Sequence, residues 1–115
     1  MSERRDALPQ VARDGAAAEF VAVSELEVDP AGIDDLEHAF ANRLGAVEGW
    51  PEFIRLEVWA DASTPGRYVM VSWWRSKDGF TEWMRSSDHD RSHARMPTAH
   101  LPKPRSFRRY RIVAH

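Results

Sequence analysis

Four segments of this chain have the residue pattern of β-strands, and their order restricts the possible folds more than any other feature. In the first of them, residues 20–28, side chains alternate between two faces, as they do along a strand in a sheet. The turn-forming residues Ser63 to Gly66 separate the second and third segments and predict a hairpin. The four predicted strands cover residues 20–28, 53–61, 67–75 and 107–113.

Helical periodicity fills the two longer intervals between these strands. Apolar residues at three- and four-residue steps predict a first helix from Ile33 to near Gly49. Ser76 is a suitable N-cap for a second helix, which carries Phe80 and Trp83. We expect this second helix to break or bend near Ser86 and the serine that follows it.

The resulting order, β-α-β-β-α-β, predicts an α+β protein with the ferredoxin-like split βαβ fold. In this fold a four-stranded antiparallel sheet carries both helices on one face. The other face needs a cover, so we expect a homodimer in the form of a dimeric α+β barrel. The length of 115 residues suits one domain at residues 19–115, preceded by a flexible arm at residues 1–18.

Composition excludes several classes of function. The formal net charge of −2 offers no general attraction to nucleic acid. The sequence has no cysteine, which excludes disulfides, thiolate catalysis and iron–sulfur ligation, and fits a reducing cytoplasm. No apolar run follows the charges of the first ten residues, so we expect neither a secretory signal nor a membrane anchor.

The most informative motif runs from the end of the third strand into the second helix. Trp74 and Ser76 form a strand-end Trp-x-Ser, Phe80 and Trp83 form a Phe-x-x-Trp, and His93 follows ten residues after Trp83. This pattern resembles the antibiotic biosynthesis monooxygenase superfamily and, within it, the haem-degrading enzymes of the staphylococcal and mycobacterial kind. The resemblance extends over residues 20–113 but is specific only at residues 74–93.

The resemblance implies a haem-degrading monooxygenase in which haem is both substrate and cofactor. Dioxygen and an external electron donor, supplied by a separate reductase or a small reductant, complete the reaction. His93 stands at the position of the axial iron ligand, with Phe80 and Trp74 as haem-binding residues. Trp83 matches the residue that presses on the porphyrin and ruffles it. In a continuous helix Trp83 and His93 would lie within about 80 degrees of each other.

Ser24 is the main departure from the family pattern. It stands where relatives usually have an asparagine that hydrogen-bonds the oxygen bound to iron, and its hydroxyl has a shorter reach than an amide. Relatives also tend to have Pro-Gly-Phe where this chain has Glu52 between Pro51 and Phe53. His89 is a rival axial ligand because it lies in the same stretch as His93.

Two other functions stay open on this sequence. The first is a cofactor-independent monooxygenase that acts on an aromatic polyketide or a quinol. The second is a non-catalytic haem-binding module that uses the same pocket. The arginines of the last strand are candidates for pairing with haem propionates, although alternating charge on an exposed strand is the commoner explanation. They are Arg105, Arg108, Arg109 and Arg111.

Overall fold

The computed structural model describes residues 18–42, 47–94, 96–97 and 99–115, except for the side chain of His93. The predicted arm therefore lies outside the described residues, apart from Ala18. The described elements in chain order are β2 (Phe20–Glu27), η1 (Pro30–Gly32), α2 (Ile33–Ala41), η2 (Val47–Gly49), β3 (Phe53–Ala60), β4 (Arg67–Trp74), α3 (Lys77–Arg85), α4 (Ser87–His93) and β5 (Lys103–Arg111).

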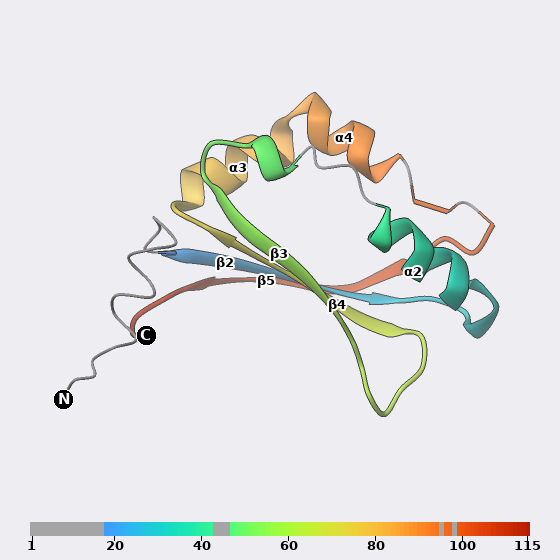
Figure 1. Ribbon diagram of the computed structural model, residues 1–115. Helices are drawn as coiled ribbons and strands as arrows, with labels where there is room; N and C mark the ends of the chain where they lie inside the picture. The colour runs from blue at the N-terminus through green and yellow to red at the C-terminus, as the bar shows by residue number, and fades with distance from the viewer. Residues whose placement is uncertain (1–17, 43–46, 95, 98) are drawn as a thin grey trace.

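The four strands form one antiparallel sheet in the order β3-β4-β2-β5. The three described α-helices lie on the same face of this sheet, with α3 and α4 over one end and α2 over the other (Figure 1). The predicted α+β, ferredoxin-like fold is therefore confirmed. No described helix or strand covers the opposite face of the sheet.

Strand register decides which side chains face the helices. Phe20, Ala22 and Ser24 of β2 pair with Trp74, Ser72 and Met70 of β4, and both sets face the helices. The intervening residues face the uncovered side. Trp73 is one of them and lies under the guanidinium of Arg55, 4.0 Å from the ring centroid. The two adjacent tryptophans of β4 thus point to opposite faces, as strand geometry requires.

The first helix is shorter than the sequence pattern predicted. The α-helix ends at Ala41, where Asn42 acts as the C-cap, and Val47–Gly49 form a separate 3₁₀ turn. Residues 43–46 lie outside the described residues. The apolar periodicity continues past the end of the helix because Val47 is also buried, although it belongs to the next element.

The second helical region is two helices joined at Ser86. This residue has extended backbone angles, φ −82° and ψ 156°, so it cannot continue α3. Its hydroxyl donates to the carbonyl of Trp83 and accepts from the backbone N–H of His89, which closes one helix and caps the next. The predicted break is confirmed, and the angular argument for a continuous helix between Trp83 and His93 does not apply.

The last strand begins earlier than predicted, at Lys103 rather than near Phe107. A proline at position 104 is tolerated because β5 is an edge strand. The register with β2 shifts between Glu25 and Leu26, which opposes Pro104 to Leu26 and leaves Arg105 as the extra residue. This irregularity hides the alternation that would mark the start of the strand.

Two apolar clusters hold the helices on the sheet. The larger lies under α3 and joins Phe20, Ala22, Val47, Trp74, Phe80 and Trp83, with Trp50, Phe53 and Leu56 packed against it. The smaller lies under α2 and centres on Val28, Leu36 and Tyr68. Between the two clusters, the helix-facing side of the sheet is not filled by side chains.

Candidate functional site

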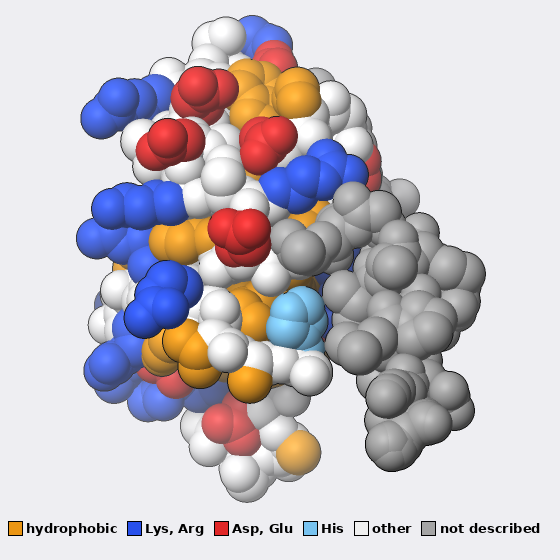
Figure 2. All heavy atoms as spheres, turned by 90° about the vertical axis from the view of Figure 1, so that its left-hand side faces the viewer, with side chains coloured by type: hydrophobic (Ala, Val, Ile, Leu, Met, Phe, Trp, Pro, Cys, Tyr) orange, Lys and Arg blue, Asp and Glu red, His pale blue; other side chains and the backbone are white. Residues whose placement is uncertain are grey.

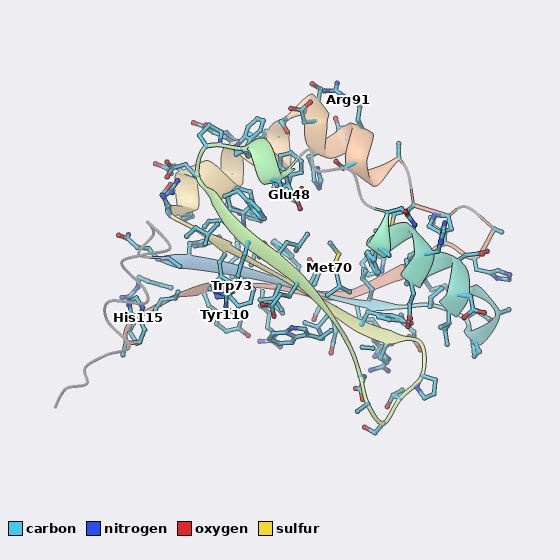
Figure 3. All side chains as sticks on the ribbon, in the orientation of Figure 1. Glu48, Met70, Trp73, Arg91, Tyr110 and His115 are labelled. Atoms are coloured by element: carbon cyan, nitrogen blue, oxygen red, sulfur yellow. The ribbon has the colours of Figure 1, made fainter. Side chains whose placement is uncertain are left out.

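A cavity of about 840 Å³ lies between the sheet and the helices. Its floor is formed by helix-facing residues of β2, β3 and β4, and its walls by α2, α3, α4 and the segment around residues 96–102. Met70 on β4 points from the sheet toward the helices into this space, whereas Trp73 and Tyr110 belong to the opposite face (Figure 3). The floor side chains are Ala22, Ser24, Leu26, Leu56, Met70 and Ser72.

Interlocked aromatic rings build the wall on the side of α3. Phe80 contacts Trp74 edge to face, with ring centroids 5.4 Å apart, and stacks on Phe107 of β5 at 5.9 Å. Trp74 also meets Phe53 edge to face. Trp74 is only 1% exposed, so it forms the base of this wall, and Phe80 lies above it. Both predicted haem-binding residues therefore line the cavity.

Trp83 lies further along α3, in the same wall. Its ring makes edge-to-face contacts with Trp50, at 5.4 Å, and with the imidazole of His89, at 5.5 Å. The side chain is 7% exposed, and its accessible surface borders the cavity. Such a ring has little freedom to turn away from a bound ligand.

Hydroxyl groups are the polar groups of the cavity floor. Ser24 on β2 is half-buried and lies opposite Met70 of β4 and Phe107 of β5. Ser72 on β4 lies opposite Ala22 and Leu56, and its Oγ accepts a hydrogen bond of 2.8 Å from the indole N–H of Trp74. Sequence reasoning selected Ser24 but missed Ser72, although Ser72 shares the helix-facing side of β4 with Trp74.

The two candidate histidines stand on the same short helix. His93 is the last residue of α4, and its side chain lies outside the described part of the structure. His89 is half-buried and its ring borders the cavity beside Trp83. The structure thus places the imidazole of His89 on the cavity wall beside α3 and leaves the choice of axial ligand as a prediction.

The mouth of the cavity combines polar and exposed apolar residues. Asp35 and His38 of α2 and the C-cap Asn42 border it, and the amide nitrogen of Asn42 lies 3.3 Å from the His38 ring. Met84, Leu101 and Phe107 border it elsewhere and keep large exposed surfaces. Such a rim suits a flat apolar ligand with a polar edge.

Positive charge gathers at one edge of the molecule. Figure 2 looks at the end where β2 begins and β5 ends, and Lys and Arg side chains run along one side of that view. The arginines of β5 are exposed, and Arg105 pairs with Glu27 at 3.0 Å. Arg109 lies on the same face of β5 as Phe107, 6.0 Å from that ring.

A second, smaller cavity of about 230 Å³ lies beside α2 and is lined by Glu37, Phe40, Val58, Ala60 and Tyr68. The Tyr68 hydroxyl donates to Glu37 Oε2 at 2.6 Å. Burial, together with this carboxylate, raises the pKa of Tyr68 to about 12. The phenol is therefore a structural group that stays protonated.

Within the described residues, no cluster of three or more histidine, aspartate or glutamate side chains is placed to hold a metal ion. None of the helices in that part of the chain is long and apolar enough to span a membrane.

The sequence matches a family model described as antibiotic biosynthesis monooxygenase over residues 19–95. A curated relative, the mycobilin-producing haem oxygenase of Mycobacterium tuberculosis, is 32% identical over 63 residues. That match covers 55% of this chain and 60% of the relative, so it spans less than two thirds of the length of the curated protein.

Solved structures share the fold over most of their length. The haem-degrader MhuD of Mycobacterium tuberculosis, solved with two haems in its active site, superposes with a TM-score of 0.70 at 25% identity and covers 84% of this chain and 97% of its own. SnoaB, a cofactor-independent oxygenase of Streptomyces nogalater, superposes with a TM-score of 0.69 at 19% identity and covers 86% and 97%.

Proposed function

Since the chain belongs to the antibiotic biosynthesis monooxygenase family, we propose that it is a monooxygenase that binds haem in the cavity and cleaves the porphyrin with dioxygen. The observation that carries this proposal is the cavity of about 840 Å³, which has an aromatic wall and is bordered by α4, the helix that contains both candidate histidines. Its volume lies within the range of about 300 to 1,000 Å³ that ligand pockets usually have. The similarity to a haem oxygenase and to a haem-degrader supports this choice of substrate.

In this proposal, residues of α3 and α4 make the main contacts with haem. His93 supplies the axial nitrogen to the haem iron, and His89 is the rival because its ring already borders the cavity. Trp83 presses on the porphyrin plane, and its two edge-on neighbours give it the rigidity that this role requires. Ser24 donates a hydrogen bond from the sheet.

The remaining parts of the reaction come from outside the chain. Dioxygen is the oxidant, and an external donor, ascorbate in vitro or a separate reductase, supplies electrons. The protein works as a homodimer in the cytoplasm, a compartment that suits a sequence without cysteine. Exposed arginines at the edge of β5 are available for the propionates, without a single residue being singled out.

Haem titration tests the binding step. We expect a Soret band that saturates on adding haem, and its loss in His93→Ala but not in His89→Ala. His115→Ala serves as the matched control because its side chain is exposed near the end of the chain. Loss of the Soret band in His89→Ala alone would identify His89 as the axial ligand. A wild-type protein without a Soret shift contradicts haem as the ligand.

Turnover is tested separately from binding. Haem-loaded protein with ascorbate and oxygen, under catalase to remove free peroxide, should lose its Soret band slowly. Ser24→Asn should lose it faster, because the longer side chain restores the reach of the amide found in relatives. Stable haem in both proteins would leave a haem-binding module. A protein without a Soret shift that oxidises a phenolic substrate would be a cofactor-independent monooxygenase.

A further inference from the structure

Ser72 is a polar residue of the cavity floor whose orientation is fixed by the protein itself. It lies on the central strand β4, half-buried, with apolar Ala22 and Leu56 as its cross-strand neighbours. A half-buried hydroxyl in such surroundings is stabilised by a hydrogen bond. The indole N–H of Trp74 provides that bond, at 2.8 Å.

This bond decides what the hydroxyl can still do. A serine hydroxyl has one proton to donate and two lone pairs to accept with, and the indole N–H can only donate. The bond therefore occupies a lone pair of Ser72 and leaves its proton available. Among the described residues no acceptor takes that proton, and the side chain borders the cavity.

Trp74 is a rigid support for this hydroxyl. Its ring is wedged between Phe53 and Phe80, each with a centroid separation of 5.4 Å, and is 1% exposed. The packing of Trp74 in the aromatic wall therefore holds Ser72 Oγ in place on the cavity floor. A hydroxyl oxygen held in this way has its proton free to donate into the cavity.

Ser24 is a diagonal neighbour of Ser72 across the β2–β4 pair. Ser72 opposes Ala22, and Ser24 opposes Met70, so the two serines are offset by two residues on the same face. Diagonal neighbours in antiparallel sheets lie about 7 to 8 Å apart, which leaves room for one small atom between their hydroxyls. The side chain of Ser24 likewise has no hydrogen-bond partner among the described residues.

We propose that Ser72, oriented by Trp74, and Ser24 together donate hydrogen bonds to dioxygen when it binds in the cavity beside haem. This inference rests on the proposed function and names a second contact residue for it. In relatives, one long asparagine side chain reaches the ligand from a single strand. Here two short serine hydroxyls would reach the same position from adjacent strands. Ser72 is accordingly a specificity-determining residue for a diatomic ligand.

Infrared spectra of the ferrous haem complex with carbon monoxide test the pair without turnover. Loss of a hydrogen-bond donor near the ligand raises the C–O stretching frequency, because the pocket then stabilises less negative charge on its oxygen. We expect Ser72→Ala and Ser24→Ala each to raise it, and Ser72→Thr to keep the wild-type value. Haem decay in Ser72→Ala should slow about 5-fold, the factor for a net hydrogen bond of about 1 kcal/mol.

Two further variants keep the test decisive. Ser72→Ala leaves the buried indole N–H of Trp74 without its acceptor, so Ser72→Ala with Trp74→Phe removes both hydrogen-bonding groups and separates loss of the hydroxyl from the effect of an unpaired indole. Ser106→Ala is the matched control, since Ser106 borders the same cavity but donates to Glu25 at 3.2 Å. The frequency should not move in this control.

The outcomes separate the two proposals. A normal Soret band together with an unshifted C–O frequency in Ser72→Ala, and in the double variant, overturns the serine pair and leaves haem binding intact. A wild-type protein without a Soret band overturns both. A shift in Ser24→Ala alone also contradicts the assignment of Ser72.

Discussion

At the scale of single residues, Trp83 has a structural role in the core and a proposed role in the reaction. Its ring is almost fully buried between Trp50 and His89, so Trp83→Ala should lower the free energy of unfolding by about 3 to 5 kcal/mol. Glu82→Ala, at an exposed position on the same helix, should change it by less than about 0.5 kcal/mol. Urea unfolding measures both.

Because Trp83→Ala disturbs the fold, Trp83→Phe is the better variant for function. It keeps an aromatic ring in the wall while removing part of the surface that would press on the porphyrin. We expect haem affinity close to that of the wild type and slower decay of the Soret band. Equal decay rates in the two proteins would remove Trp83 from the reaction.

Tyr68 makes stability depend on pH at the alkaline end. Its pKa is raised to about 12 in the folded chain, against an ordinary value of 10, so the folded state keeps a proton that the unfolded state loses. The stabilisation is complete below pH 10 and disappears as the pH rises toward 12, by about 1 to 3 kcal/mol. Urea midpoints measured between pH 8 and 12 should fall accordingly.

The matched comparison for this effect is Tyr68→Phe against Tyr110→Phe. The first removes the buried phenol that bonds Glu37, so its stability should vary less between pH 10 and 12 than that of the wild type. The second removes an exposed phenol and should retain the wild-type slope. Parallel curves of stability against pH for the wild type and Tyr68→Phe would show that Tyr68 is not the source of the alkaline loss of stability.

Four of the site residues that the family resemblance selected border one cavity. Strand alternation had placed Ser24 on one face of its strand, and helical spacing had placed Phe80 and Trp83 on one helix. Ser72 was missed because the role proposed for it depends on a hydrogen bond from Trp74, which local patterns do not report. Phe107 meets Phe80 only through the pairing of strands distant in sequence. The role of His93 stays a prediction.

At the scale of elements, Glu52 in the turn before β3 packs closely against Gly79 in the first turn of α3. A Cβ at position 79 would overlap the Cβ and Cγ of Glu52, and Glu52 Oε1 accepts from the N-cap Ser76 at 3.0 Å. Gly79→Ala should therefore lower the free energy of unfolding by about 1 to 3 kcal/mol.

The same substitution should be milder in a Glu52→Gly background, where the overlapping atoms are gone. Relatives tend to have glycine at the position of Glu52, so this background restores the family turn. A double-mutant cycle measured by urea unfolding gives the coupling between the two positions. Additive effects would show that helix propensity, rather than the overlap, controls position 79.

The strands and helices were predictable in type and order, and the differences lie at their ends. The α-helix stops at Ala41 although apolar spacing continues to Val47, because burial of Val47 is achieved by a 3₁₀ turn instead. The start of β5 was missed because Pro104 and the irregular register opposite Leu26 obscure the alternation. Burial patterns report which side chains are inside, not which backbone brings them there.

At the scale of the whole molecule, the uncovered sheet face favours self-association. Val71 is 3% exposed there, while Trp59 and Tyr110 on the same face are each 49% exposed. This mixture of apolar and partly exposed aromatic residues is typical of an interface. We expect light scattering to give twice the mass of the chain.

A charge in the middle of that face should produce monomers. Val69 opposes Glu25 on one side and Trp59 on the other, so a lysine there is tolerated in water but not in an interface. Val69→Lys should halve the mass measured by light scattering, whereas Val113→Lys, at a position 77% exposed, should not. A monomeric wild type at micromolar concentration would contradict the dimer.

The double cap at Ser86 separates two elements of unequal local stability. Helix α3 is anchored by Gly79, Phe80 and Trp83, all buried, whereas none of the described side chains of α4 is fully buried. Local opening therefore starts at α4, whose amide protons should exchange with solvent before those of α3. Opening of α4 about Ser86 would withdraw the imidazole of His89 from Trp83 and widen the cavity for a flat molecule, while α3 stays packed on the sheet.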